Sequence, residues 1–218
     1  MLDESPGLIQ SAQYDFPYHH LPRLYRWNHL LEYEVYLQRV VWWIRTLAPD
    51  GLLDVGCGDG RLLREVGWGY GVDLEPRAIR WAKAVGVKAD CLDARGLTIR
   101  YGLVTAVEVL EHIPPPQARG FVRTLAERSN GMVLITVPTT NVPVPSKHYR
   151  HFDTLSLLGT VSGILEPLWV EDLIDQPWWW SALERIPLKA HEGWLKRHLK
   201  TIAKPGRGRH LLLIGKPI

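Results

Sequence analysis

A short apolar run followed at once by three closely spaced glycines constrains this chain more than any other feature. Residues 52–55, Leu-Leu-Asp-Val, are predicted to form a buried strand, and Gly56, Gly58 and Gly60 come directly after it. Glycine adopts backbone conformations that other residues avoid, and its missing side chain lets a ligand approach the main chain closely. Because a helical stretch over 61–66 follows, the sequence predicts a strand, a ligand-binding loop and a helix.

Apolar runs alternate with helical segments through the middle of the chain. Further strands are predicted at 70–74, 87–92, 103–107, 132–137 and 168–174, with helices at 76–85, 115–128 and 154–163. A helix over 25–47 precedes this pattern, and a strand over 210–215 follows it. Such alternation predicts an α/β fold, a Rossmann-like doubly wound sheet with helices on both faces.

We expect one domain of 218 residues. It divides into an N-terminal cap and helical segment (1–48, irregular over 1–22), a core (49–175), a Trp-rich basic insertion (176–209) and a last strand (210–218). Cys57 and Cys91 are the two cysteines, too few for a disulfide framework and without zinc-site spacing. The acidic N-terminus resembles no secretory signal, and no apolar run reaches roughly 18 residues. We therefore expect a cytoplasmic protein that does not span a membrane.

The residues around the glycine loop narrow the class of ligand. A dinucleotide site has the pattern G-x-G-x-x-G, but Arg61 stands where its third glycine would be. Asp73, at the end of the next predicted strand, suits a ribose diol because one carboxylate accepts two hydrogen bonds. Asp54 either orients the loop or meets positive charge on the ligand, or it caps the loop backbone.

Five segments in order carry a resemblance to a known family. They read LLDVGCGDGRLL from residue 52, GVDLEPRAI from 71, LDARGL from 92, GLVTAVEVLEHI from 102 and MVLITVP from 132. Together they resemble the successive motifs of class I S-adenosylmethionine-dependent methyltransferases, of the type that acts on small molecules. The resemblance implies S-adenosyl-L-methionine as cofactor and a seven-stranded, mostly parallel sheet whose last strand runs antiparallel.

The resemblance also implies the cofactor site, residue by residue. The glycine loop lines the methionine part of the cofactor, Asp73 binds the ribose, Asp93 and Ala94 flank the adenine, and Glu108 closes the pocket near the reacting methyl. The full set of expected cofactor residues is Asp54, Gly56, Cys57, Gly58, Gly60, Asp73, Leu74, Asp93, Ala94 and Glu108. In such enzymes the protein mainly aligns a nucleophile with the methyl group and excludes water.

Three residues are candidates for catalysis. Glu111 and His112 follow the strand over 103–107 and therefore lie at the carboxyl edge of the sheet, where open α/β folds bind ligands. His148 belongs to the segment 147–152, which resembles a stretch that faces the acceptor in small-molecule methyltransferases. We expect His148 to contact the acceptor or act as general base, with His112 second; a structural hydrogen bond is the alternative for His112.

A metal is the alternative use of these side chains. Some relatives, among them ubiquinone-pathway O-methyltransferases and small-RNA 2′-O-methyltransferases, hold a divalent metal with a similar Glu-x-x-Glu-His run and a later His, here His148 or His151. The run is also common in relatives without a metal, so we assign none from the sequence.

The segments outside the core bear on the acceptor and the partners. The aromatic segment 14–20 is expected to cover the active site. Trp178–Trp180 and a predicted basic amphipathic helix over 191–204 suit either packing on the domain or contact with an anionic membrane through 176–209. Residues 185–210 hold eight Lys or Arg against one acidic residue, which leaves the rest of the chain with a net charge of −4.

These features lead to one expected function and two alternatives. We expect methyl transfer to a small-molecule, glycan or lipid-linked acceptor, at oxygen. The alternatives are a nucleic-acid methyltransferase and a non-catalytic protein that binds adenosylmethionine. The basic stretch favours nucleic acid, but we do not expect that partner because no RNA-binding module is recognised and no Asn/Asp-Pro-Pro-Tyr/Phe signature follows the strand over 103–107. The sequence indicates no oligomeric state.

Overall fold

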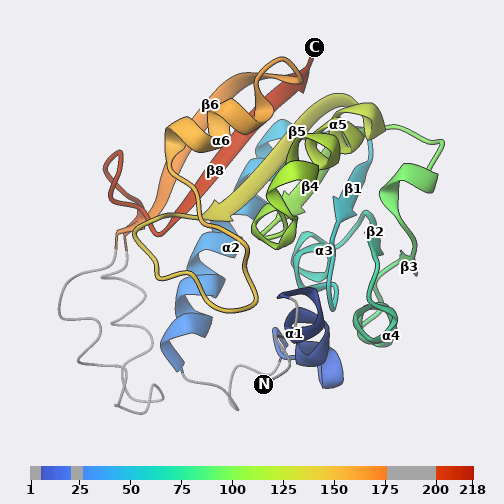
Figure 1. The fold of residues 1–218 in the computed structure, drawn as a ribbon. Coiled ribbons are helices and arrows are strands. Elements are labelled where there is room, and N and C mark those ends of the chain that lie inside the picture. The colour runs from blue at the N-terminus through green and yellow to red at the C-terminus, as the bar shows by residue number, and fades with distance from the viewer. Residues whose placement is uncertain (1–5, 21–26, 176–199) are drawn as a thin grey trace.

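An eight-stranded mixed sheet lies at the centre of the computed structural model, which describes residues 6–20, 27–175 and 200–218 (Figure 1). The strands are β1 (Leu52–Val55), β2 (Tyr70–Asp73), β3 (Ala89–Cys91), β4 (Tyr101–Val107), β5 (Ser129–Pro138), β6 (Leu165–Asp175), β7 (Lys200–Ile202) and β8 (His210–Pro217). The helices are α1 (Pro6–Ala12), α2 (Trp27–Leu47), α3 (Arg61–Val66), α4 (Pro76–Ala84), α5 (Ala118–Arg128) and α6 (Thr154–Val161).

The strand order confirms the predicted fold class. It runs β3-β2-β1-β4-β5-β8-β6-β7, with β1 to β5 parallel and β8 antiparallel to both β5 and β6. After β3 the chain returns to place β4 beside β1, so the order reverses between these two strands. In open α/β sheets ligands bind at this switch point, outside the carboxyl ends of the strands.

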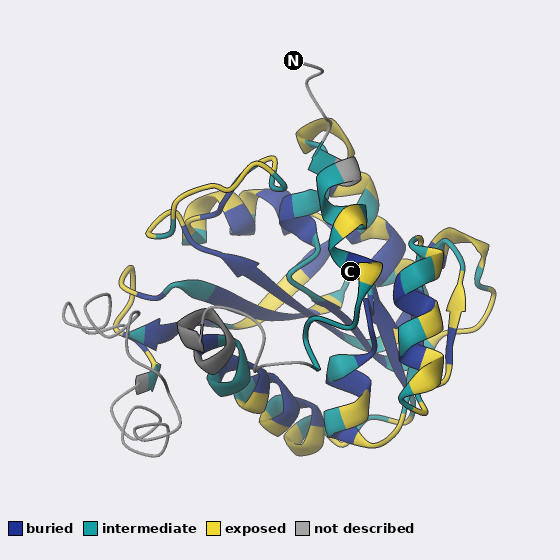
Figure 2. Cartoon of the chain, turned by 90° about the horizontal axis from the view of Figure 1, so that it is seen from below, coloured by how far each residue is buried: buried dark blue, intermediate teal, exposed yellow. Residues whose placement is uncertain are grey.

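Each face of the sheet packs against its own set of helices. On β1, Leu52 belongs to the core cluster that contains α2 and α3, whereas Leu53 belongs to the cluster that contains α5 and α6. Both side chains are almost fully buried. Figure 2 shows the sheet as buried and the outer surfaces of the helices as exposed. This double burial explains why the predicted strands read as continuous apolar runs.

The structure corrects the prediction for the N-terminus. We expected residues 1–22 to be irregular, but α1 and a 3₁₀ turn over Gln13–Asp15 lie within them. Arg77 of α4 donates to the Ser11 carbonyl and hydroxyl oxygens at 2.8 Å, and Trp81 Nε1 donates to the Tyr14 carbonyl at 3.1 Å. Tertiary contacts of this kind stabilise a helix too short to form alone.

A second correction concerns the insertion between the last two predicted strands. The sheet has an eighth strand there, β7, which pairs antiparallel with β6. Residues 200–202 therefore do not continue the predicted helix over 191–204. Residues 203 and 204 are not helical either, and Trp178–Trp180 and residues 191–199 lie outside the described residues. Among the helices that the structure describes, none combines the length and the apolar character needed to cross a bilayer.

Candidate active site

The three glycines of the β1–α3 loop all have left-handed backbone conformations, with φ values of 75° at Gly56, 55° at Gly58 and 79° at Gly60. Two of them also lack room for a side chain. A Cβ at Gly56 would come within 2.6 Å of Val109 Cγ2, and one at Gly58 within 2.7 Å of the Tyr14 hydroxyl. The loop therefore requires glycine both for its turn and for its close neighbours.

Asp73, at the end of β2, links this loop to the start of α4. Its Oδ2 accepts a hydrogen bond of 2.8 Å from the Gly58 backbone N–H, and its Oδ1 accepts one of 2.9 Å from the Glu75 N–H. Each oxygen keeps a second lone pair, so both remain able to accept from a ligand. The acidic residue predicted to bind ribose thus lies directly against the glycine loop.

A cavity of about 800 Å³ opens at this edge of the sheet. Six of the ten predicted cofactor residues line it: Gly56, Asp73, Leu74, Asp93, Ala94 and Glu108. They come from the ends of successive strands, as the motif order predicted. Leu74 is 71% exposed, and Asp93 caps the 3₁₀ turn Ala94–Gly96 by accepting from the Arg95 N–H at 2.9 Å.

The other four predicted cofactor residues, Asp54, Cys57, Gly58 and Gly60, do not line this cavity. Asp54 is buried on β1, where its Oδ1 accepts a 2.7 Å hydrogen bond from the Thr105 hydroxyl, and burial raises its pKa to about 7. The Cys57 side chain is buried in the core, where a Cβ at Gly71 would come within 2.6 Å of its sulfur. Both side chains therefore support the loop from behind.

The N-terminal segment forms one wall of the cavity. Gln10, Ser11 and Tyr14 line it, so residues before the sheet do lie over the site. Sequence reasoning anticipated a cover from the aromatic segment but missed Gln10 and Ser11, because they fall in the stretch expected to be irregular. Further along, His19 Nδ1 lies 2.9 Å from Asp59 Oδ1, so this imidazole holds the loop.

Glu108 follows β4 with φ at 56°, an uncommon conformation for a residue other than glycine. Thr136 of β5 fixes it: the Glu108 N–H donates to the Thr136 carbonyl at 3.1 Å, and the Thr136 hydroxyl donates to Glu108 Oε1 at 3.1 Å. Backbone strain of this kind persists only where neighbouring residues stabilise the conformation, and it is common at functional sites. Glu108 is thereby held at the wall of the cavity.

A buried imidazole pairs with Glu108 from the other side. His210 Nδ1 forms an ion pair of 3.1 Å with Glu108 Oε2, and its Nε2 forms another of 3.1 Å with Glu32 Oε1. Burial alone lowers the pKa of His210, but the two carboxylates outweigh it and raise that pKa to about 10. His210 is therefore a cation at neutral pH. The sequence placed it only at the start of a strand.

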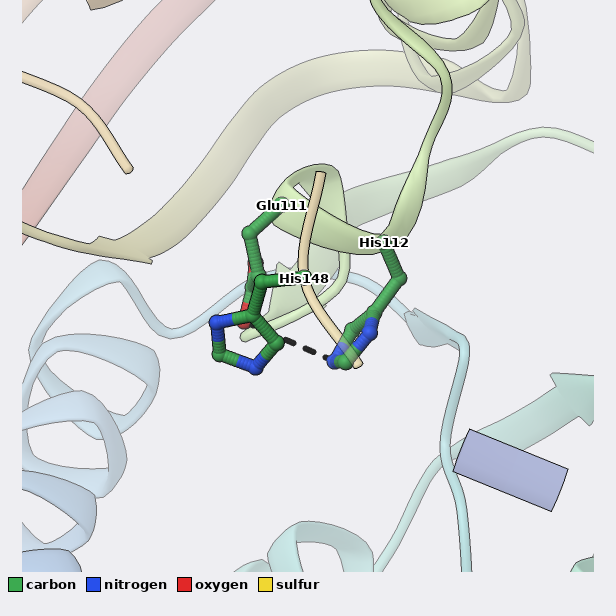
Figure 3. Close-up of side chains that lie close together, drawn as sticks. All are labelled: Glu111, His112 and His148. Atoms are coloured by element: carbon green, nitrogen blue, oxygen red, sulfur yellow. Dashed lines mark ion pairs between the residues drawn. The ribbon is translucent and has the colours of Figure 1, made fainter. Parts of the chain in front are cut away.

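The structure brings the three predicted catalytic side chains together. Glu111 and His112 lie on the 3₁₀ turn Leu110–His112, and His148 lies across from them (Figure 3). The rings of His112 and His148 are nearly perpendicular, with centroids 4.5 Å apart, and Glu111 Oε1 lies 3.8 Å from His112 Nε2. We call Glu111, His112 and His148 the Glu–His–His cluster. His112 also lines the cavity described above, so the cluster and the cavity adjoin.

Burial sets the charge states in the cluster. It lowers the pKa of His112 to about 4 and that of His148 to about 3, so both imidazoles are neutral at pH 7. Burial, reinforced by the nearby Glu108, raises the pKa of Glu111 well above its usual value. Lys147, whose ammonium donates to Gln13 Oε1 at 3.1 Å, is the neighbouring basic side chain that sequence reasoning missed.

Several solved structures of similar fold are described as methyltransferases. Magnesium protoporphyrin IX methyltransferase from Synechocystis PCC 6803, with bound SAM, has a TM-score of 0.65 at 12% identity over 97% of this chain and 96% of that one. A possible histamine N-methyltransferase from Thermotoga maritima has a TM-score of 0.62 at 17% sequence identity, over 86% of this chain and 91% of that one. The N-methyltransferase NodS from Bradyrhizobium japonicum WM9, in complex with S-adenosyl-L-homocysteine, has a TM-score of 0.60 at 14% sequence identity, over 97% of this chain and 96% of that one. At such identities the likeness shows the fold.

The sequence itself matches a family profile, although no curated protein matches it significantly. The profile is described as a methyltransferase domain and covers residues 10–205, well over half of the chain. It therefore includes the glycine loop, the cavity and the Glu–His–His cluster. The chain belongs to this methyltransferase-domain family, which confirms the family predicted from its motifs.

Proposed function

We propose that this chain transfers the methyl group of S-adenosyl-L-methionine to an oxygen atom of a small-molecule, glycan or lipid-linked acceptor. The observation that carries the proposal is the position of the Glu–His–His cluster. Through His112 it adjoins the cavity whose walls hold the residues expected to bind the donor. The expected donor site and a group of imidazole and carboxyl side chains thus adjoin at one edge of the sheet.

The donor fits the residues present. The cavity volume lies in the usual range for a small-molecule site, and Gly56 of the glycine loop lines the cavity. Asp73 has free lone pairs for two ribose hydroxyls, Asp93 and Ala94 flank the place for adenine, and the Glu108 carboxylate suits a positively charged amino group. The bound donor supplies a methyl group on a positively charged sulfur, which is electrophilic without activation.

On the acceptor side the chain must orient a hydroxyl group and exclude water. His148 and His112 are neutral, so each has a nitrogen lone pair that accepts a hydrogen bond from such a group. Glu111 is fully buried beside them, and its raised pKa favours the neutral carboxyl group, which can donate as well as accept a hydrogen bond. These properties favour oxygen as the methylated atom, because a hydroxyl loses its proton on methylation.

The predicted partners depend on two different parts of the chain. A small-molecule acceptor fits the enclosed site. Contact with an anionic membrane through 176–209 stays a prediction, because 176–199 lie outside the described residues. The nucleic-acid alternative relies on the same basic stretch. The donor cavity and cluster support catalysis over a non-catalytic binding role.

A product screen tests the proposal. Purified protein is incubated with methyl-labelled S-adenosylmethionine and fractions of a cell extract, and mass spectrometry identifies the labelled compound and atom. We expect label on oxygen in a small-molecule or lipid fraction, and none when Asp73 is replaced by Ala. Label in RNA would establish the nucleic-acid alternative. If the protein binds the donor and labels no fraction, the non-catalytic alternative holds instead.

A further inference from the structure

Glu111 is a buried carboxyl group without a hydrogen-bond partner. Its side chain is fully buried, and neither of its oxygens accepts a hydrogen bond from any residue that the structure describes. Its nearest basic contact is His112 Nε2, 3.8 Å from Oε1. Buried polar atoms are nearly always paired, because leaving one unpaired costs free energy. An unpaired carboxyl at this depth therefore points to a positively charged ligand.

Backbone carbonyl groups orient the two imidazoles of the cluster, that of His112 directly and that of His148 through His151. His112 Nδ1 lies 2.9 Å from the Lys147 oxygen, and His151 Nδ1 lies 2.8 Å from the Val142 oxygen. A carbonyl oxygen only accepts, so both Nδ1 atoms carry the hydrogen. With its hydrogen on Nδ1, His151 can use Nε2, which lies 2.8 Å from His148 Nδ1, to accept the hydrogen of His148. The same tautomer results for His112 and His148, with a lone pair on Nε2.

This arrangement is typical of metal-binding histidines, which donate their other ring N–H to a carbonyl or a similar acceptor. In the cluster, one potential ligand atom from each of Glu111, His112 and His148 lies within 4.8 Å of the other two. Two atoms that each bind the same ion at about 2.1 Å lie at most about 4.2 Å from each other. Small side-chain rotations are therefore enough to bring the three ligand atoms to binding distance. We propose that Glu111, His112 and His148 bind one divalent transition-metal cation.

The donor atoms select the kind of cation. Two imidazole nitrogens and one carboxylate oxygen suit Zn²⁺, Co²⁺, Mn²⁺ or Fe²⁺, whereas Mg²⁺ and Ca²⁺ favour oxygen ligands alone. Glu108, the first acidic residue of the Glu-x-x-Glu-His run, is engaged elsewhere by His210 and Thr136. The described part of the chain thus supplies three ligands, which leaves the cation a position for an acceptor oxygen. That last role rests on the proposed function; the cation site rests on the geometry alone.

Cobalt binding tests the site without knowledge of the acceptor. Chelator-treated protein is titrated with Co²⁺ and followed by visible absorption and calorimetry. We expect one equivalent to bind with visible bands. Glu111→Gln or His148→Gln should weaken binding by more than about 100-fold, and His151→Leu by about 10–100-fold, the usual effect of losing an outer partner. His151→Gln, whose amide oxygen still accepts from His148, should restore part of that loss. Glu127→Gln, at an exposed residue, is the matched control.

The outcomes separate this inference from the proposed function. Donor binding is measured on every variant, which also reports whether the protein is folded. If the wild type binds no Co²⁺, or if Glu111→Gln and His148→Gln bind it as tightly as Glu127→Gln does, the cation site is wrong and methyl transfer is untouched. If Co²⁺ binds as expected but S-adenosylmethionine does not bind, the proposed function fails and the cation site stands.

Discussion

The carboxylate of Glu108 and the imidazole of His210 form an ion pair of 3.1 Å across the site, between the end of β4 and the start of β8. His210 has Glu32 on its other side at 3.1 Å. One buried cation therefore serves two carboxylates, only one of which lines the cavity. This pairing holds Glu108 in place where its backbone is strained.

Replacing His210 with Gln should destabilise the protein by about 3 kcal/mol, because removing one member of a buried ion pair leaves the other charge uncompensated. Urea unfolding followed by circular dichroism measures the loss. Lys216→Gln, at an exposed position of the same strand, should change stability by less than about 0.5 kcal/mol. Equal unfolding midpoints for the two variants would refute the role given to His210.

Asp73→Ala should weaken the binding of S-adenosylmethionine by about 10–100-fold, because charged hydrogen bonds to the ribose and to the Gly58 N–H are both lost. Isothermal titration calorimetry measures the affinity. Asp90→Ala is the matched control, since Asp90 lies on the neighbouring strand β3 and pairs with Lys83 rather than lining the cavity. The same affinity in both variants would show that Asp73 does not bind the donor.

Gly58→Ala should weaken donor binding, because its methyl group would displace Tyr14 from the cavity wall. Gly67→Ala separates this effect from backbone strain: Gly67 also has positive φ, at 91°, but a Cβ there meets nothing within 4 Å. Both variants should lose about 1 kcal/mol of stability or more. Only Gly58→Ala should lose affinity for S-adenosylmethionine. A similar loss of affinity in Gly67→Ala would mean that Tyr14 does not shape the site.

Glu75 should make stability depend on pH in the acid range. Its hydrogen bond with Arg77, together with one from Ser11, lowers its pKa from 4.5 to about 2 against the opposing effect of burial. Because the folded-state pKa lies below the unfolded one, the stabilisation is complete above pH 4.5 and is lost as the pH falls toward 2.

The measurement compares wild type with Glu75→Gln by urea unfolding at pH 7 and pH 3. The wild type should be the more stable at pH 7, and the difference should shrink at pH 3. Glu127→Gln, at a half-exposed residue, is the control for the loss of a surface carboxylate at both pH values. A difference that stays constant between pH 7 and pH 3 would contradict the contact of Glu75 with Arg77.

The sequence predicted the core of the fold well because its signals are local. The run 52–55, the glycine turn and the helix 61–66 were predicted with the bounds that β1 and α3 have. These elements are buried on both sheet faces, so their apolar pattern is continuous. By contrast, α1 and β7 are short and depend on contacts with distant residues such as Arg77 and Leu173. No local pattern encodes such contacts.

The candidate site also has one part that local sequence signals predict and another that depends on contacts between distant residues. Residues at strand ends, such as Asp73 and Glu108, could be placed from the motif order alone. The cluster residues were also named from the sequence, yet their grouping depends on the loop that returns His148 to His112, 36 positions later in the chain. The positive charge of His210 depends on Glu32 and Glu108, which lie far from it along the chain. Only the fold brings these charges together.

The N-terminal wall of the cavity has a consequence for turnover. Ser11 and Tyr14 line the cavity, and Arg77 contacts this wall through Ser11 and Asp15. Spent cofactor is as large as the fresh donor apart from one methyl group, so it must leave by the route through which the donor entered. Where that route passes the wall, each cycle requires these polar contacts to open and reform. The pace of product exchange is then set by residues that precede the whole sheet in the chain.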